Sequence, residues 1–433
     1  MLHTLRPSSG LRRRSASANP HLLVLAWLFP PMVWGGIYRP VSFVREAASA
    51  GWRVTVVCGP EPDLFTKAGR YMLSRVPEDV RILRISPSRL EPSFRWFPRV
   101  DGGFATALET VLALCDLSVA DVPDVVLASG PPFHNFIAGW MLTKGWGAKL
   151  VLDYRDEWTQ CPFPFVRLGN ADGKWEARCL RDADAVVFVT ESVRRLHLRI
   201  FPELDAGRCH IIPNGWEPDD LSVETAPGPR GLREGPITLS FLGNLGEHSL
   251  PGELLAVVAK LVEKRPVWRE RLRIRFIGQQ CRIATGQLSD FPHQQMVSVE
   301  GLVPKPDALR IMRESDALLL INAPALDRSL PGKMFDYLAS GSPLFVFGEG
   351  GEIGQVMRQL NAGVVVPDND PDALERALES LRGGVFGDPK TRTKWLETHT
   401  RPYLARKMLD LLSMVVSGAP DPLDAASQLA GNR

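Results

Sequence analysis

The sequence lacks the features that mark several common classes of protein. Its six cysteines include no Cys-x-x-Cys pair, which argues against a disulfide framework and against a zinc site. Its 51 basic and 49 acidic residues leave a formal charge of +2, far from the strongly basic balance of a dedicated nucleic-acid-binding protein. No segment reaches the roughly 18 uninterrupted apolar residues that a membrane span requires. We therefore expect a reduced, cytoplasmic, globular protein that binds no nucleic acid.

The N-terminus carries the clearest charge asymmetry. A cluster of arginines within residues 1–20 precedes the apolar run "HLLVLAWLFPPMVWGG", an order that resembles a secretory signal peptide. Pro30 and Pro31 break this run, and no small-x-small cleavage site follows. We expect residues 1–20 to form a disordered basic leader, able to contact the inner face of an anionic membrane, and the apolar run to begin a buried strand.

Short apolar runs alternate with amphipathic stretches along most of the 433 residues. In the first half "LLVLAWLF" is followed by "PVSFVREAASAG" and then by "WRVTVVCG", and the pattern continues to about residue 214. The stretch 222–236 has three prolines and three glycines, as linkers do, and the alternation resumes at "ITLSFLG". Continuous Val, Ile and Leu runs separated by helical segments indicate parallel sheets covered on both faces.

The predicted fold is therefore α/β, with two doubly wound Rossmann-like domains facing a central cleft. Two domains also suit the length, because single cores stop growing at about 250 to 300 residues. We place the domains at residues 21–221 and 237–388, separated by the linker 222–236. Residues 389–415 are predicted to form a helix that packs back toward the first domain, and residues 416–433 a tail.

Ligands of such sheets bind beyond the carboxyl ends of the strands, so the loops there are the candidate sites. In "FPPMVWGGIYRP", Gly35 and Gly36 allow close approach of the backbone to an acceptor, and Tyr38 begins a helix. This loop lacks the G-x-G-x-x-G spacing, which argues against a nicotinamide or flavin enzyme. An ordinary glycine turn is the alternative.

Two later loops of the first domain hold the other candidates. "SGPPFHNF" places His134 near a helix start, and "DYRDEWTQ" follows the next strand with Asp156 and Trp158. His134 and Asp156 are candidate catalytic residues that orient the acceptor or the sugar, and Trp158 is a candidate surface for binding the acceptor. The alternatives are a hydrogen-bonded structural histidine and a solvated charged turn.

The stretch "SLPGKMFDYLASGSPLFVF" gives the strongest signal in the second domain. Gly332 and Lys333 begin a helix, where unpaired N–H groups and the helix dipole attract phosphate. Asp336 lies one turn further on, where its carboxylate can accept the hydroxyl groups of a ribose. The pattern predicts a bound nucleotide. An amphipathic helix in which Lys333 and Asp336 merely pair is the alternative.

Two glycine-rich corners accompany this helix: "FLGNLGEHSL" with Gly243 and Asn244, and "GEGGEIGQVM" with Gly351 and Glu352. The acidic tripeptides at 182–184 and 368–370 look like Asp-x-Asp metal motifs, but they fit a strand start and a helix N-cap better. We therefore predict no metal.

These loops together resemble the GT-B glycosyltransferases, specifically the retaining family 4 group, over roughly residues 21–415. The matching segments are "WGGIY", Asp156-Glu157-Trp158, "PNG" at 213–215, "FLGNLG", "SLPGKMFDYLASGSP" and "RPYLARKMLDLL". The resemblance implies that the second domain binds a nucleotide-diphosphate sugar, UDP- or GDP-linked, as co-substrate. It also implies that the first domain binds a glycan, lipid-linked or small-molecule acceptor.

The sequence departs from the family pattern at the donor site. Many members carry two glutamates separated by seven residues, and here Arg328 and Asp336 take their places. The common Lys-Gly after the first donor-domain strand is also missing, so positive charge is expected from Lys333, Arg328 and backbone amides. We predict metal-independent transfer of a sugar to a hydroxyl or amine, with retention. A nucleotide-sugar epimerase and a non-catalytic nucleotide-sugar-binding protein remain the alternatives.

Overall fold

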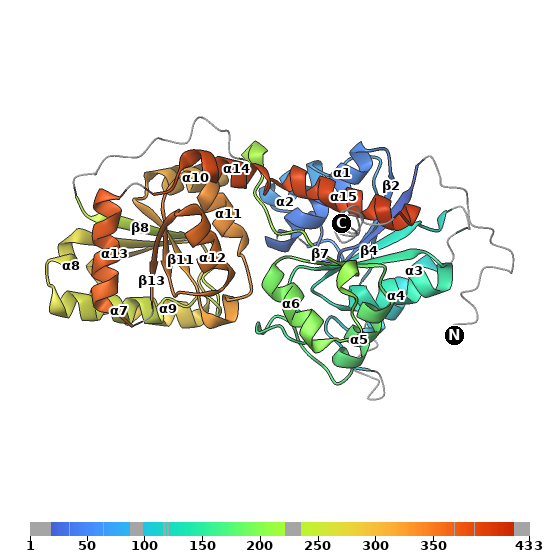
Figure 1. Ribbon diagram of the computed structural model, residues 1–433, viewed down its shortest axis with the longest axis horizontal. Coiled ribbons are helices and arrows are strands. Elements are labelled where there is room, and N and C mark those ends of the chain that lie inside the picture. The colour runs from blue at the N-terminus through green and yellow to red at the C-terminus, as the bar shows by residue number, and fades with distance from the viewer. Residues whose placement is uncertain are drawn as a thin grey trace, which may run out of the picture. The chain divides into compact units, whose positions relative to one another are not determined.

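The computed structural model describes residues 19–33, 35–63, 65–86, 98–115, 118, 121–220, 235–367, 369–384 and 386–419. They form two compact units, of which the first runs to Pro213 and resumes at Pro402 (Figure 1). The second unit runs from Asn214 to Arg401. The predicted leader, linker and tail lie wholly or mostly outside the described residues.

The first unit is built on a parallel sheet of seven strands in the order β3-β2-β1-β4-β5-β6-β7. The strands are β1 (His21–Leu25), β2 (Arg53–Cys58), β3 (Arg81–Arg84), β4 (Val125–Gly130), β5 (Lys149–Tyr154), β6 (Ala185–Phe188) and β7 (Cys209–Ile211). The helices are η1 (Gly35–Ile37), α1 (Tyr38–Ser49), α2 (Lys67–Ser74), α3 (Phe104–Leu114), α4 (His134–Trp146), α5 (Asp172–Asp182), α6 (Glu191–Ile200) and α15 (Arg401–Ser417).

Alternate side chains of the central strand β1 enter two separate cores. Leu22 and Val24 pack with α1, α2 and α15 on one face of the sheet, whereas Leu23 and Leu25 pack with α3 to α6 on the other. Because helices cover both faces, the inner strands must be apolar on both sides. This explains their continuous runs of Val, Ile and Leu.

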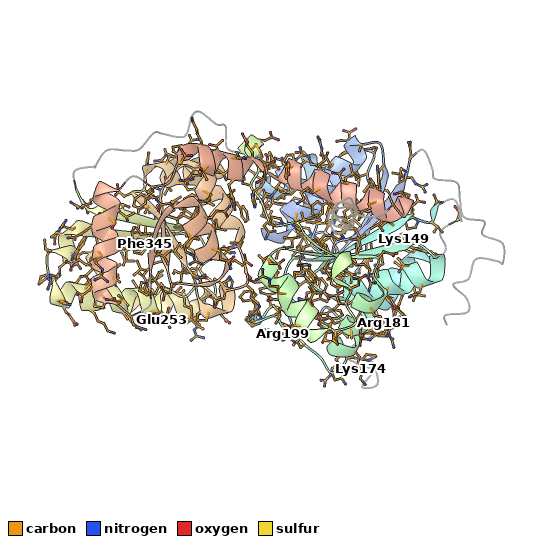
Figure 2. The ribbon with its side chains drawn as sticks, in the orientation of Figure 1. Lys149, Lys174, Arg181, Arg199, Glu253 and Phe345 are labelled. Carbon is orange, nitrogen blue, oxygen red and sulfur yellow. The ribbon has the colours of Figure 1, made fainter. Side chains whose placement is uncertain are left out.

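The second unit repeats the design with six parallel strands in the order β10-β9-β8-β11-β12-β13. The strands are β8 (Ile237–Leu242), β9 (Leu272–Ile277), β10 (Val297–Glu300), β11 (Ala317–Ile321), β12 (Leu344–Phe347) and β13 (Gly363–Val366). The helices are α7 (Gly252–Lys264), α8 (Trp268–Arg271), α9 (Arg282–Ser289), α10 (Lys305–Glu314), α11 (Gly332–Ala339), α12 (Gly351–Leu360), α13 (Pro371–Gly383) and α14 (Pro389–Glu397). Figure 2 shows Phe345 of β12 inside this unit and Glu253 of α7 at its surface.

The parallel, doubly wound fold predicted from the alternation is confirmed in each unit. The prediction missed β3, an edge strand whose sequence "RILR" has only two apolar residues between two arginines and so lacks a longer apolar run. Within the described ranges, no helix combines the length and the apolar composition needed to cross a bilayer.

The chain passes between the units at different positions from those predicted. The first passage falls directly after Pro213, before the predicted linker at 222–236. The predicted closing helix at 389–415 is two helices, α14 in the second unit and α15 in the first. Pro402 lies in the first turn of α15, where a helix does not need the N–H that proline lacks, so the helical pattern restarts there.

Candidate functional site

Each sheet has one place where the strand order reverses: between β1 and β4 in the first unit, and between β8 and β11 in the second. The loops on the two sides of such a point separate and leave a crevice at the carboxyl ends of the strands, where open α/β sheets bind their ligands. In the first unit these are the loops that end at Tyr38 and at His134. In the second unit they are the loop beginning at Gly243 and the loop that ends at Lys333.

The structure brings Gly243 and Lys333 together, although they are far apart in the sequence. Lys333 Nζ lies 3.6 Å from the centroid of the Phe241 ring, at the carboxyl end of β8. A Cβ placed on Gly243 would be 3.5 Å from both Cε and Nζ of Lys333. Gly243 has a φ of +117°, which favours glycine, and its backbone is exposed. The amine is therefore next to an open stretch of backbone.

The amine of Lys333 has no partner in the part of the chain that the structure describes, because its Nζ forms neither a hydrogen bond nor an ion pair there. The alternative pairing of Lys333 with Asp336 is therefore not what the structure contains. Burial lowers the pKa of Lys333 to about 7. Burial and the charge of Lys333 also lower the pKa of His248, in the loop that follows Gly243. A bound anion next to this amine would stabilise its protonated, charged form, so the site favours an anionic ligand.

Some of the other predicted donor residues are accessible near Lys333, and the rest make contacts inside the protein. Gly332 and Asn244 are exposed near Lys333, and Asp336 is half-buried one turn along α11. Gly351, with a φ of +58°, allows α12 to approach the backbone of Asp327, which a Cβ would overlap. Glu352 and Arg328 lie in the same region. The backbone N–H of Glu352 donates to the carbonyl of Asp327 at 2.8 Å, and Arg328, which follows Asp327 in the sequence, is half-buried.

In the first unit, His134 lies at the reversal point between β1 and β4. It is the first residue of α4, and its side chain is 1% exposed. The ring meets Trp27, just after β1, edge to face with 4.8 Å between centroids. Neither ring nitrogen has a hydrogen-bond partner among the described residues, and burial lowers the pKa of His134 to about 3. The alternative of a hydrogen-bonded structural histidine does not apply.

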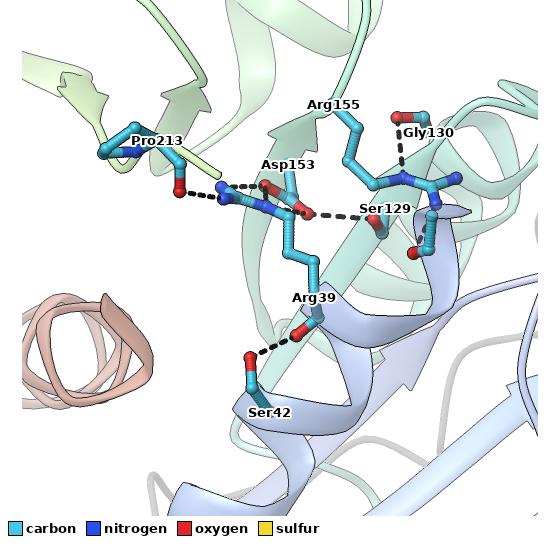
Figure 3. A network of polar contacts seen from close by, with 8 residues as sticks. Arg39, Ser42, Ser129, Gly130, Asp153, Arg155 and Pro213 are labelled. Atoms are coloured by element: carbon cyan, nitrogen blue, oxygen red, sulfur yellow. Dashed lines mark hydrogen bonds and ion pairs between the residues drawn. The ribbon is translucent and has the colours of Figure 1, made fainter. Parts of the chain in front are cut away.

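Arg155, directly after β5, ties the loops of the first unit together. Its guanidinium donates to the carbonyl oxygen of Gly130 at 3.2 Å (Figure 3). It also donates to the carbonyl oxygens of Gly36, at 2.8 Å, and Pro131. A Cβ on Gly36 would overlap this guanidinium, so the second glycine of the predicted loop is needed for a contact inside the protein. Gly35 has open space around its Cα, as an acceptor-facing position requires.

A second buried arginine, which the sequence reasoning missed, supports the same region. Arg39 forms an ion pair with Asp153 at 2.7 Å, and Ser129 donates to the same carboxylate at 2.9 Å (Figure 3). Arg39 also donates to the carbonyl of Pro213 at 2.8 Å, at the end of the first stretch of this unit. The signal available in the sequence was an arginine surrounded by apolar residues in "YRPVSFV". Tyr38, its neighbour, is half-buried against the core of α1.

The prediction that Trp158 binds the acceptor is wrong. Its side chain is fully buried, and its ring stacks on Phe133 with 5.0 Å between centroids. Its Nε1 donates to the carboxylate of Asp172 at 2.6 Å. The carboxylate that accepts this hydrogen bond lies 14 residues further along the chain. The local sequence around Trp158 therefore resembled an exposed charged turn. Burial raises the pKa of Asp156 to about 6 while its side chain stays partly exposed, and its catalytic role stays a prediction.

The acidic tripeptides have structural partners. Asp184 accepts hydrogen bonds from the backbone N–H of Leu150 and from Lys149, and Asp182 accepts one from Trp140. Asp370 caps α13 through the N–H groups that follow it. Asp368 lies outside the described residues.

Comparisons with known proteins relate the chain to glycosyltransferases. Residues 35–215 match the family model described as "Glycosyl transferase 4-like domain". A D-inositol 3-phosphate glycosyltransferase of Nocardioides sp. is 26% identical over 228 residues, which are 47% of this chain and 48% of that protein. The chain spans about half the length of the curated relatives it matches.

Solved structures match over most of the chain. Sucrose-phosphate synthase of Thermosynechococcus elongatus has a TM-score of 0.66 at 15% identity, covering 93% of this chain and 100% of that one. A structure from E. coli titled as trehalose-6-phosphate bound with UDP-2-fluoro glucose has a TM-score of 0.63 at 15% identity, covering 90% and 98%. These likenesses establish the fold. Together with the domain match over residues 35–215, they make the chain similar to the family 4-like GT-B glycosyltransferases.

Proposed function

We propose that the protein transfers a sugar from a nucleotide-diphosphate sugar to an acceptor hydroxyl or amine, with retention at the anomeric carbon and without a metal. The observation that carries this proposal is the unpartnered amine of Lys333 at the start of α11, beside the exposed backbone of Gly243. The site offers a positive charge and free N–H groups. A diphosphate is the ligand group that needs both.

The donor binds along α11. Its diphosphate contacts Lys333, the first N–H groups of the helix and the backbone of Asn244, because the N–H of Gly243 already donates to the carbonyl of Ile277. Its ribose lies one turn deeper, where the carboxylate of Asp336 accepts the hydroxyl groups. Arg328 adds positive charge at the diphosphate, in place of the acid that many family members have there.

In the reaction, the bond between the anomeric carbon and the diphosphate oxygen breaks, and the acceptor oxygen or nitrogen bonds to that carbon. The acceptor loses a proton, which leaves with the diphosphate. The negative charge that develops on the leaving group is stabilised by Lys333 and the helix N-terminus, and fixed charges of this kind supply much of the rate enhancement in enzymes. Asp156 holds the acceptor, and the buried ring of His134 supports the loops around the acceptor through its contact with Trp27.

Metal independence is supported by the structural use of the acidic tripeptides, which leaves charge neutralisation to Lys333. Retention is supported only by the likeness of residues 35–215 to the glycosyl transferase 4-like domain. The acceptor binds to the first unit near Gly35 and Tyr38. The relatives named as D-inositol 3-phosphate glycosyltransferases make this polyol phosphate one acceptor to test.

A thermal-shift screen of UDP, GDP, ADP and their glucose and mannose derivatives tests donor binding. A ligand at 100 times its Kd adds about 2.7 kcal/mol of stability, which is readily measured as a shift in Tm. The donor that binds is then incubated with a panel of polyol, glycan and lipid-linked acceptors. Release of nucleoside diphosphate together with a glycosylated product supports the proposal. Interconversion of the sugar without an acceptor would indicate an epimerase, and binding without turnover a non-catalytic protein.

A further inference from the structure

Strands β8 and β11 separate early at the reversal point of the second sheet. Only two residue pairs join them, Ala317 with Leu239 and Leu318 with Ser240. Leu242, at the end of β8, lies beyond the last of these pairs. Its backbone N–H and carbonyl on this side therefore have no strand partner, although a buried backbone group needs one.

The side chain of Tyr337 supplies both missing partners. Its hydroxyl accepts a hydrogen bond from the N–H of Leu242 at 2.7 Å and donates one to the carbonyl of the same residue at 3.0 Å. Tyr337 is fully buried, and burial raises the pKa of its phenol, so the hydroxyl keeps the proton that it donates. A hydroxyl inside an apolar core is costly unless it is hydrogen-bonded. An apolar side chain would fill this space equally well, so the hydroxyl is needed for its bonds.

These bonds hold α11 at the point where Lys333 is required. Tyr337 lies four residues after Lys333, on the same face of the helix. Three consecutive residues at the end of β8 and directly after it contact these two side chains: Phe241 and Gly243 lie against Lys333, and Leu242 bonds to Tyr337. A shift of α11 along β8 would break the hydroxyl bonds and move the amine away from Gly243.

We infer that Tyr337 is a positioning residue of the donor site, whose hydroxyl fixes α11 on β8 and thereby keeps the amine of Lys333 beside Gly243, where the diphosphate binds. The inference rests on the proposed function. Tyr337 touches no phosphate itself and acts through Lys333.

The other end of α11 is held by Arg392 of α14. Its guanidinium donates to four carbonyl oxygens at the end of the helix, those of Tyr337, Leu338, Gly341 and Ser342. A positive charge is favourable there, because the carbonyl end of the helix dipole is negative. With its carboxyl end anchored, α11 keeps its place as a unit, and the hydroxyl of Tyr337 sets the position of its first turn.

Tyr337→Phe tests this role because it removes only the hydroxyl. The matched control is Tyr154→Phe in the first unit, where an equally buried hydroxyl donates to Glu176 at 3.2 Å and makes no contact with α11. Calorimetry with UDP, GDP, ADP and inorganic pyrophosphate measures the affinity of the phosphate site. Titration with the parent nucleosides measures the affinity of the rest of the donor site. We expect Tyr337→Phe to bind the diphosphates and pyrophosphate about tenfold more weakly, with nucleoside binding unchanged. Tyr154→Phe should bind all of them as the unaltered protein does.

A second measurement follows Lys333 without any nucleotide. Acetic anhydride modifies only the neutral amine, so the extent of modification against pH, read by mass spectrometry, gives the midpoint of Lys333. This midpoint should be near pH 7 in the unaltered protein and in Tyr154→Phe. In Tyr337→Phe it should rise by at least about one unit toward the value near 10.4 of a solvated lysine.

The outcomes separate the two proposals. Equal binding and an equal Lys333 midpoint in the two tyrosine variants would overturn the role of Tyr337 and leave the transferase intact. If the unaltered protein binds none of the diphosphates, the proposed function fails, and the midpoint alone decides whether Tyr337 positions Lys333. Should Tyr337→Phe not fold, Arg392→Gln loosens the same helix from its other end and should raise the midpoint in the same direction.

Discussion

Replacing Lys333 with methionine tests the assignment of the diphosphate site directly. Methionine keeps an unbranched apolar stem near Phe241 and removes the amine. Because Nζ forms no hydrogen bond or ion pair within the described residues, its removal breaks no polar contact there. We therefore expect the Tm of Lys333→Met to be unchanged or slightly higher. Any loss of nucleotide binding then reports a lost contact with the ligand.

The expected loss follows from one hydrogen bond between charged groups, which contributes about 1.5 to 3 kcal/mol. Since 1.36 kcal/mol is a factor of ten, Lys333→Met should bind a nucleoside diphosphate about 10- to 150-fold more weakly near pH 7. The pKa of Lys333 is about 7, so the free protein loses this charge as the pH rises. The affinity of the unaltered protein should then fall about tenfold per pH unit above 7, until the bound amine also loses its proton. The variant should show no such fall.

Calorimetric titration at pH 7, 8 and 9 measures both effects. The second pKa of a terminal phosphate is about 6, so the charge of the ligand changes little over this range. Lys264→Met is the control, because Lys264 belongs to the same unit but pairs with Asp372 at its surface. Equal affinity of Lys333→Met and the unaltered protein at pH 7 would refute the reasoning. So would a fall in affinity with pH that persists in the variant.

Three further variants test other residues. Asp336→Asn should weaken binding of the parent nucleoside by about 10-fold or more, from one hydrogen bond to a charged group, while pyrophosphate binds normally; equal nucleoside affinity would exclude the ribose contact. His134→Phe loses no internal hydrogen bond, so its Tm should not fall, yet turnover should drop at least about tenfold in a transfer assay; full activity would remove His134 from the site. Asp153→Ala leaves the buried charge of Arg39 unpaired and should cost about 3 to 5 kcal/mol of unfolding free energy in chemical denaturation, whereas a cost below about 1 kcal/mol would contradict a buried pair.

The sequence predicted the fold and the start of α11 because both depend on local patterns. Continuous apolar runs identify strands of a parallel sheet, and Pro331, Gly332 and Lys333 mark a helix start with an exposed N-terminus. The strand order of such sheets then determines which loops meet. The fold class alone therefore predicted that Lys333 and Gly243 lie close together, without knowledge of any side-chain contact.

Contacts between distant residues could not be predicted in this way. Trp158 resembled a surface residue because four charged or polar neighbours surround it, but its position is determined by Asp172 and Phe133. The role of Tyr337 had no local signal, because its hydroxyl bonds to Leu242, 95 residues earlier. A single sequence records the residue types and not the partners. The buried arginine Arg39 was missed for the same reason.

The two reversal points place comparable groups in comparable positions. In each unit, the helix after the fourth strand begins at or next to a titratable side chain, His134 in α4 and Lys333 in α11. Each side chain meets an aromatic ring from the end of the unit's first strand or just beyond it, Trp27 or Phe241, and neither has a polar partner among the described residues. Polar groups without a hydrogen-bond partner destabilise the folded protein unless a ligand supplies that partner. Under the proposed function, Lys333 completes its contacts with the diphosphate of the donor, whereas the ring of His134 stays buried beneath the acceptor loops.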